Sequence, residues 1–505
     1  MKGRIAMELK AALARLDTLE ETLRAYHHAM GVLSLDGATA APKRSALGRG
    51  KTFGVLGGVT YQLLVNDEVD EMLRTILDNR SQCTPAQARR AELLREDYDD
   101  MTRIPMEEYV AYQTLVTEAD AVWHEAKEKS DFPMFAPYLE KLMDCQRRFA
   151  AYKDDRKPAY DVMLDHYEKG ASMSTLDPFF AMLRERLTPV IREIGRRPAP
   201  RTDFLHRVYP IERQRAFSLR LMDMLGMDRN CCAIAETEHP FTNGFNKWDV
   251  RITTHYHEQD VASSMYSVIH EGGHALYELG TADDAQFTCL GEGSTMGIHE
   301  SQSRFYENII GRSLPFCRAL YPVMREVFPE QLCDVTDGEL YAAVNKAEPS
   351  LIRTEADELT YATHVMIRYE MEKLMMGGEV KVDELPALWN KMYRDYLGVE
   401  VTCDREGILQ DSHWSGGSFG YFPSYALGSA YGAQMLRAME KDVDVWAHVE
   451  KGDLAPVTAW LREKIHRHGR MLTPAQLLEN ALGAPFDPSF YTDYLTKKFT
   501  ELYHL

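Results

Sequence analysis

Residues 270–274 read His270-Glu271-Gly272-Gly273-His274, and the interpretation of the whole chain starts from this stretch. On an α-helix, residues four apart lie on one face at about 6 Å from each other, so the two imidazoles can bind the same metal ion. Glu271 directly follows the first histidine and points to the side of the ion, where a carboxylate can take a proton from an attacking water. The stretch predicts a zinc site with a general base beside it.

The flanking sequence predicts that this motif lies inside one helix, from Val261 to Gly280. Apolar residues recur at core-facing spacing on both sides of the motif, and Gly280 supplies a C-terminal stop signal. Gly272 and Gly273 each cost about 1 kcal/mol relative to Ala in a helix interior. We therefore expect another chain segment or a substrate to pack close to this backbone.

Glu300 is the candidate for the third metal ligand, 26 residues after His274. Helical spacing follows it as far as Ile310, which predicts a second helix antiparallel to the first, joined to it by the glycine-rich segment 281–297. Two histidines and one glutamate form a catalytic zinc ligand set that leaves a fourth position open.

Composition limits the class of protein. The chain has 505 residues, 45% of them hydrophobic, which allows a large core and two to four domains by length. Its 77 acidic and 58 basic residues give a net charge of −19, which argues against nucleic acids and anionic membranes as partners. The sequence contains no run of 18 apolar residues, so it predicts no membrane span. The charged segment 1–16 does not resemble a secretory signal. Eight cysteines without C-x-x-C spacing indicate reduced thiols, so we expect a cytoplasmic protein.

Most of the chain has the periodicity of amphipathic helices. A break rich in Gly, Ala and Pro covers 37–50, and the proline-rich segment 197–201 reads as a loop within a domain. The predicted helices are 7–30, 55–65, 69–79, 85–102, 106–130, 134–155, 158–168, 175–195, 339–346, 351–376 and 381–396, with further helices between 426 and 505.

One segment alternates with a period of two instead. From Asn246 to His255, apolar and polar residues alternate, which is typical of a strand. The preceding Asn243-Gly244 pair is a turn signal, so we expect a small antiparallel hairpin. A strand immediately before the metal helix is a plausible edge for a peptide to bind by strand addition.

Five motifs in order make the chain resemble, over nearly its full length, the M32 metallopeptidases, often called the carboxypeptidase Taq family. The motifs are D-x-R-x-T (Asp249, Arg251, Thr253), H-E-x-x-H (His270 to His274), H-E-S-Q (His299 to Gln302), I-R-x-x-A-D (Ile352, Arg353, Ala356, Asp357) and G-x-x-Q-D-x-H-W (Gly407, Gln410, Asp411, His413, Trp414).

The resemblance implies a mainly α-helical, cleft-containing fold similar to thimet oligopeptidase and angiotensin-converting enzyme, with one small antiparallel sheet beside the active site. It also implies one divalent metal per chain, Zn²⁺ or Co²⁺, and a homodimer. We expect a single peptidase domain over 1–505, with a helical lid region at about 1–200 and a catalytic core at about 201–505. Two positions depart from the family pattern: Gly272, where a bulkier residue is common, and Leu35-Asp36, where Trp-Asp is common.

The reaction also needs donors for an oxyanion beyond the metal. The candidates are His239, His413, Tyr421 and Tyr425. His413 and both tyrosines are predicted on a glycine-rich loop similar to the glycine-and-tyrosine loop of related oligopeptidases. The alternative for each residue is a packed or surface aromatic ring, and we expect at least one tyrosine and one histidine to act.

An enzyme that cleaves at the C-terminus must bind a free carboxylate, which a fixed guanidinium does with two hydrogen bonds. Arg353 is the candidate, and an ion pair with Asp357 on the same helix is the alternative. Gln410 and Asp411 are expected to orient His413 or a metal-binding imidazole.

Asp249, Arg251 and Thr253 alternate onto one face of the predicted strand. They either set the edge of the substrate cleft, support the metal ligands, or have a structural role.

The leading hypothesis is a metal-dependent carboxypeptidase that acts on peptides with a free C-terminus and uses Glu271 as general base. An oligo-endopeptidase of the thimet type on the same scaffold is the alternative, because the metal chemistry is identical. A helical interaction protein with a vestigial site predicts an incomplete set of ligands and base, and the set in this chain is complete.

Overall fold

A computed structural model describes residues 7–505, in which the chain forms helices α1 to α20 and three strands. The first six residues of the segment considered as a secretory signal lie outside this range. Contacts divide the chain into two compact units. Within the described residues, the first unit comprises 7–103, 209–294 and 454–473, and the second comprises 104–208, 295–453 and 474–505.

The first unit begins with four helices whose apolar faces form one core. Leu16 and Leu19 of α1 are fully buried against Met72 and Ile76 of α3, which is what the amphipathic pattern predicts. The break expected at 37–50 is shorter than predicted, because α1 continues to Thr39 and α2 already begins at Ala46. The helices are α1 (Leu9–Thr39), α2 (Ala46–Leu64), α3 (Asp67–Asp78) and α4 (Pro85–Thr102).

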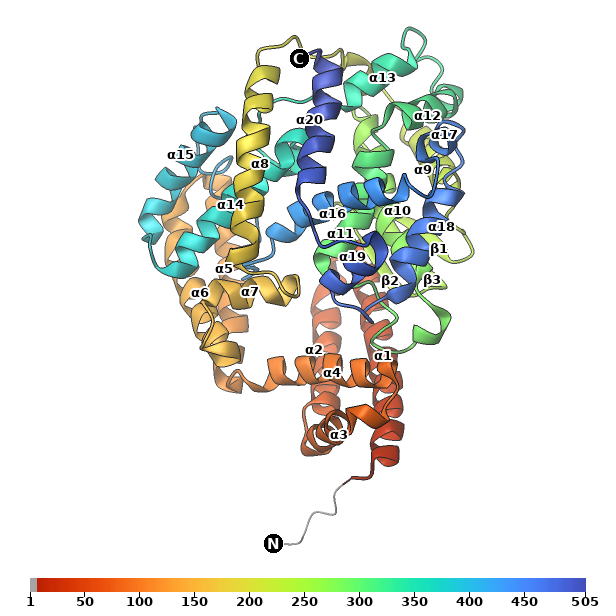
Figure 1. The fold of residues 1–505 in the computed structure, drawn as a ribbon. Helices are drawn as coiled ribbons and strands as arrows, with labels where there is room; N and C mark the ends of the chain where they lie inside the picture. The colour runs from red at the N-terminus through yellow and green to blue at the C-terminus, as the bar shows by residue number, and fades with distance from the viewer. Residues whose placement is uncertain (1–6) are drawn as a thin grey trace, which may run out of the picture. The chain divides into compact units, whose positions relative to one another are not determined.

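The rest of the first unit surrounds a small sheet. Strand β3 is central, and β2 forms one edge (Figure 1). Helices α9 and α10 pack against each other, and α10 also contacts β2 and β3. The elements are α9 (Ile211–Met224), β1 (Cys232–Glu236), β2 (Thr242–Asn246), β3 (Asp249–Thr254), α10 (Val261–Gly280) and α18 (Ala455–Lys464).

The predicted hairpin is present, but two of its details were wrong. Strands β2 and β3 are antiparallel, whereas β1 pairs with β3 in parallel, so the sheet is mixed. Gly244 lies inside β2 and the turn falls at residues 247–248. A Cβ at Gly244 would lie 2.9 Å from the Glu278 side chain, so the glycine marks the close approach of α10 to the strand and not a turn.

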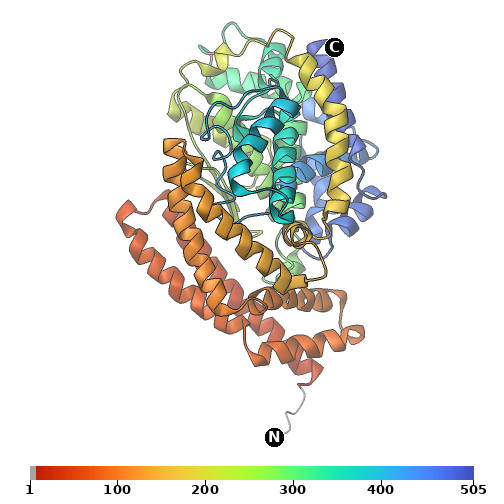
Figure 2. The same ribbon diagram turned by 90° about the vertical axis from the view of Figure 1, so that its left-hand side faces the viewer.

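The second unit is entirely helical apart from its loops. Helices α5 and α6 pair through a two-residue connection (Figure 2). Helices α8 and α20, far apart in sequence, lie side by side (Figure 1). The helices are α5 (Met106–Lys129), α6 (Phe132–Asp154), α7 (Ala159–Tyr167), α8 (Met173–Ile194), α11 (Met296–Arg304), a π-helix (Phe305–Ile310), α12 (Leu314–Val327), α13 (Asp337–Val344), α14 (Glu358–Gly377), α15 (Leu385–Leu397), α16 (Pro423–Met439), α17 (Val445–Glu450), α19 (Pro474–Leu482) and α20 (Ser489–Tyr503).

The helix predicted at 351–376 begins seven residues later than expected. Residues 353–355 form a single 3-10 turn, and α14 starts at Glu358. The Asp357 carboxylate caps this helix by accepting hydrogen bonds from the backbone N–H groups of Leu359 and Thr360, at 2.9 and 3.1 Å. The aspartate therefore ends the preceding segment, and Arg353 does not share a helix with it.

All eight cysteines are free thiols. Across residues 7–505, no helix combines the length and the apolar character that a membrane crossing requires.

Candidate metal centre and substrate site

Helix α10 places the two histidines of the motif, and it spans Val261–Gly280 as the sequence predicted. The Asp260 side chain accepts a hydrogen bond from the Ser263 backbone N–H at 3.1 Å and so fixes the start of the helix. One turn separates His270 from His274, and their ring centroids lie 5.0 Å apart. The imidazoles therefore share one face of the helix.

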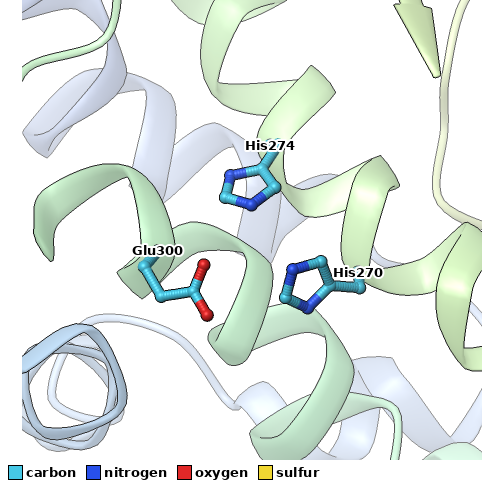
Figure 3. Close-up of side chains that lie close together, drawn as sticks. All are labelled: His270, His274 and Glu300. Atoms are coloured by element: carbon cyan, nitrogen blue, oxygen red, sulfur yellow. The ribbon is translucent and has the colours of Figure 1, made fainter. Parts of the chain in front are cut away.

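Glu300 completes a group that can bind a metal ion. His270, His274 and Glu300 each offer one ligand atom, and these atoms lie within 4.8 Å of one another. Figure 3 shows the two rings and the carboxylate pointing toward one another. Among the described residues this is the one such set of three or more His, Cys, Asp or Glu side chains. Two nitrogen donors and one carboxylate fit a catalytic zinc ion.

Hydrogen bonds orient the Glu300 carboxylate. Arg304, one turn later on α11, donates from Nε to Glu300 Oε1 at 2.7 Å, and the Ser303 hydroxyl lies 3.2 Å from Oε2. Arg304 also donates to Glu307 at 3.2 Å. Such supporting bonds hold a ligand in its binding geometry. The sequence analysis assigned no role to Arg304, although its i,i+4 spacing from Glu300 indicated the pair.

Gly428 allows Glu300 to take this position. It lies on α16, which packs closely against α11. A Cβ built on Gly428 would lie 2.7 Å from Glu300 Cβ and 2.9 Å from the Glu300 backbone carbon. Because backbone atoms cannot swing aside as a flexible side chain does, any other residue here would displace Glu300.

Gly428→Ala is therefore expected to weaken metal binding by about 10-fold or more, because it moves a ligand away from its partners. Titration of the apo-protein with Zn²⁺ measures this effect. Gly432→Ala, one turn along the same helix, is the matched control, since its Cβ would come no closer than 3.3 Å to the end of the Ile309 side chain and 3.4 Å to the Ser301 carbonyl oxygen. Equal metal affinities of the two variants would contradict the role given to Gly428.

Close packing explains why position 272 is a glycine, as expected for a glycine inside a helix. A Cβ at this position would lie 2.7 Å from Leu225 Cδ1, so the segment after α9 packs directly on the backbone of α10. The expectation that another chain segment approaches this backbone is thus confirmed for Gly272.

Glu271 is almost completely buried, with 6% of its surface exposed. The Thr242 hydroxyl, on strand β2, lies 2.6 Å from Glu271 Oε2 and 3.0 Å from the Glu271 carbonyl oxygen. The carboxylate thus has a fixed orientation next to the first histidine. The sequence analysis did not single out Thr242, because nothing in a local pattern pairs a strand hydroxyl with a helix residue 29 positions later.

Arg353 is buried in an ionic cluster. Its Nε and Nη2 lie 2.9 and 2.8 Å from Asp411 Oδ1, and its Nη1 donates to the Tyr361 hydroxyl at 3.1 Å. Arg368 pairs with the other oxygen of the same aspartate at 2.6 Å. Asp411 therefore balances only one of two arginine charges. Among the described residues, these contacts engage three of the five N–H groups of Arg353, so two remain for a ligand.

The structure contradicts one alternative and one expectation about this cluster. The ion-pair partner of Arg353 is Asp411, 58 positions away, and not Asp357. Gln410 and Asp411 contact the two arginines: the Gln410 side-chain oxygen accepts from the Arg353 backbone N–H at 2.9 Å and from Arg368 at 2.6 Å. Their hydrogen bonds orient guanidinium groups, and Asp411 acts on the His413 ring through its charge.

His413, Tyr421 and Tyr425, which the sequence analysis assigned to one loop, lie close together. His413 Nε2 lies 3.3 Å from the Tyr425 hydroxyl, and the two tyrosine rings are 5.1 Å apart. Tyr425 lies in the first turn of α16 and not on the loop. Burial, assisted by the charge of Arg353, lowers the pKa of His413 to about 4. Burial, followed by the charge of Glu300, raises the pKa of Tyr421 to about 12, so its phenol keeps its proton near neutral pH.

The remaining candidates lie in the first unit. His239 is in the connection between β1 and β2, where its carbonyl accepts from the Thr237 hydroxyl at 2.9 Å. Asp249 holds Arg251 through two bonds of 2.8 and 2.7 Å, and Arg251 lies over the Phe245 ring at 4.9 Å. Thr253 is fully buried, and its hydroxyl accepts from the Phe241 backbone N–H at 2.8 Å. These contacts fix the position of strand β2 and of the loop that connects β1 to it.

Comparisons with known proteins agree over almost the entire chain. A family model described as "Carboxypeptidase Taq (M32) metallopeptidase" matches residues 15–499. "Carboxypeptidase 1" of Bacillus subtilis is 39% identical over 484 residues, which are 95% of this chain and 96% of that protein. "Thermostable carboxypeptidase 1" of Thermus thermophilus is 36% identical over 493 residues, 95% of this chain and 96% of that protein.

Solved structures show the same similarity. The M32 carboxypeptidase from Deinococcus radiodurans superimposes with a TM-score of 0.95 at 36% identity, covering 98% of this chain and 100% of that one. The Pyrococcus furiosus carboxypeptidase gives 0.93 at 34% identity, covering 97% and 99%.

Proposed function

Because the chain belongs to the carboxypeptidase Taq (M32) metallopeptidase family and is a metal-dependent carboxypeptidase, we propose that His270, His274 and Glu300 bind its divalent metal ion. The observation that carries this assignment is the convergence of the three ligand atoms within 4.8 Å. Glu271 acts as the general base on the same helix.

The chemistry follows from the arrangement of these side chains. A divalent ion, when bound, supplies a Lewis acid that polarises the peptide carbonyl and lowers the pKa of water from 15.7 to about 7. Glu271 takes the proton of the attacking water and delivers it to the leaving amine. Thr242 holds the Glu271 carboxylate at 2.6 Å, so the base needs little reorganisation before it accepts the proton.

Tyr421 and Tyr425 are the proposed donors for the oxyanion. Burial raises the pKa of both phenols, so both remain hydrogen-bond donors near neutral pH. His413 stays neutral, because burial lowers its pKa to about 4, and its contact with the Tyr425 hydroxyl orients that phenol. His239 remains a further candidate donor.

Arg353 is the proposed receptor of the substrate carboxylate. The cluster of Arg353, Arg368 and Asp411 has one positive charge in excess, and a carboxylate balances it. The bonds from Asp411 and Tyr361 fix the guanidinium plane, which favours two parallel hydrogen bonds to a planar anion. A carboxypeptidase requires the free C-terminal carboxylate of its substrate, whereas the alternative oligo-endopeptidase does not.

Two peptides of identical sequence, one with a free and one with an amidated C-terminus, test this proposal. Mass spectrometry of the products should show that the enzyme cleaves the free peptide and leaves the amidated one intact. In Arg353→Met, kcat/KM for the free peptide should fall by about 100-fold, because the substrate carboxylate loses its charged partner. Arg394→Met, which removes an exposed arginine paired with Glu400, is the control. Internal cleavage of the amidated peptide would favour the endopeptidase.

We also propose zinc as the metal, a homodimer and a cytoplasmic location. The nitrogen and carboxylate ligand set supports zinc over magnesium or calcium. Eight free thiols support a reducing compartment. The family resemblance supports the homodimer and the division into a lid region at about 1–200 and a catalytic core at about 201–505. Metal analysis and light scattering of the purified protein test the first two.

A further inference from the structure

The first unit contains a pocket of about 1000 Å³ that the reaction described above does not use. One face of α1 forms one wall, strand β2 forms a second, and the loop 286–292 forms a third. The side chains of Phe245 and Phe287 supply its aromatic lining.

The pocket begins next to the proposed general base. Residues 243–246 of β2 line it, and the preceding residue, Thr242, is the one whose hydroxyl contacts Glu271 at 2.6 Å. A strand advances about 3.3 Å per residue, so Phe245 lies about 10 Å along β2 from Thr242. Strand β2 lies at the edge of the sheet, so an extended peptide paired along it from the catalytic centre would reach this pocket.

The charged groups of the pocket are largely paired with one another. Arg24 forms an ion pair with Glu292, and Arg90 forms one with Asp17 at 2.6 Å. Pairs of opposite charge leave little net field for a charged ligand. The recognition chemistry that remains is that of the aromatic rings.

Phe245 is held rigidly in the pocket wall. Gly31 of α1 gives it room, because a Cβ there would lie 2.8 Å from the ring, and His28 packs on it with ring centroids 4.7 Å apart. On the other side, Arg251 lies over the ring, and Asp249 fixes Arg251. The D-x-R-x-T motif thus positions an aromatic wall of this pocket.

Phe287 is presented in a strained conformation. Its φ is +61°, a region that a bulky aromatic residue rarely adopts, and 60% of its surface is exposed. The neighbouring backbone is fixed, since Gln286 accepts from the Lys247 backbone N–H at 3.0 Å and the Cys289 backbone N–H donates to Glu20 at 2.8 Å. The ring stacks on Trp248 with centroids 6.0 Å apart, but Trp248 is itself 48% exposed, so burial in the core does not account for the strained backbone. A ligand side chain in the adjoining pocket would cover the exposed face of Phe287.

We propose that this pocket binds an aromatic or large apolar side chain of the peptide, about three residues upstream of the scissile bond. The assignment rests on the proposed function, because a carboxypeptidase has only one residue downstream of the cut. A site that extends about 10 Å from the base along a strand therefore holds the upstream part of the substrate. Phe245 and Phe287 are the residues that determine this preference.

Hexapeptides with identical C-terminal residues, in which a single Phe replaces Ala at successive upstream positions, test the proposal. Wild type should show the largest gain in kcat/KM with Phe at the third position, by about threefold to tenfold. An Asp at that position should give no gain. The same enzyme should cleave an N-acyl dipeptide that is too short to reach the pocket.

Phe287→Gly is the decisive variant, because glycine adopts a positive φ without steric cost. We expect it to lose the preference for Phe, to cleave the N-acyl dipeptide as wild type does, and to keep or raise its melting temperature. Phe287→Asn also tolerates this backbone region and should behave in the same way. Leu47→Ala removes an apolar side chain that is 74% exposed and lies outside the pocket, and it should keep the preference.

Three results would overturn the proposal: a wild type indifferent to the upstream residue, a Phe287→Gly variant that keeps the preference, or one that melts earlier, since this would give Phe287 a packing role. A wild type inactive on the N-acyl dipeptide and on all the hexapeptides with a free C-terminus would instead contradict the proposed function. The two failures are therefore distinguishable.

Discussion

Glu271→Gln is expected to keep its metal ion and to lose activity by about 1000-fold. The amide has nearly the shape of the carboxylate and can still lie against the Thr242 hydroxyl, so the packing of α10 should not change. It cannot accept a proton, so neither the attacking water nor the leaving amine is assisted. Because Glu271 follows His270 but is not one of the three converging ligands, the metal affinity should stay within a few-fold of wild type.

Elemental analysis and peptide hydrolysis on the same preparation measure both quantities. Glu258→Gln, at an exposed position before α10, is the matched control and should have wild-type activity. A Glu271→Gln protein that retains its metal and cleaves at the wild-type rate would remove Glu271 from the mechanism. A variant that loses its metal would show that Glu271 supports the ligands and is not only a base.

His274→Ala is expected to abolish activity by loss of the metal. Three protein ligands hold the ion, and removal of one leaves only His270 and Glu300, which is too few for a catalytic zinc site. The fold should persist, because alanine is the most favourable residue in a helix interior and α10 packs through its other faces. Wild type stripped by a chelator should recover its activity on addition of Zn²⁺. The variant should not recover at the same concentration.

Isothermal titration with Zn²⁺ and circular dichroism separate loss of metal from loss of fold. His124→Ala replaces an exposed histidine and is the control, with binding equal to wild type. A chelated wild type that hydrolyses peptides undiminished, or a His274→Ala protein that binds zinc as tightly as wild type, would contradict the assignment of the metal centre.

The sequence by itself determined those parts of the site that depend on interactions between residues close together along the chain. The limits of α10 follow from a cap at Asp260, an apolar stripe and a terminal glycine, all within 21 residues. The pairing of His270 with His274 follows from the helical repeat alone. The motifs indicated Glu300, because a catalytic zinc ion requires a third ligand and a glutamate followed by a helical pattern lies within reach of the connecting segment.

Only the tertiary structure decided the contacts between segments that are distant along the chain. Hydrophobic periodicity tells which face of an element is buried, but not which element covers it. For this reason Asp411 as the partner of Arg353, Thr242 as the partner of Glu271, and the approach of Gly428 to Glu300 had no signature in the sequence. The same holds for the exposed ring of Phe287, whose left-handed backbone is a property of the folded loop.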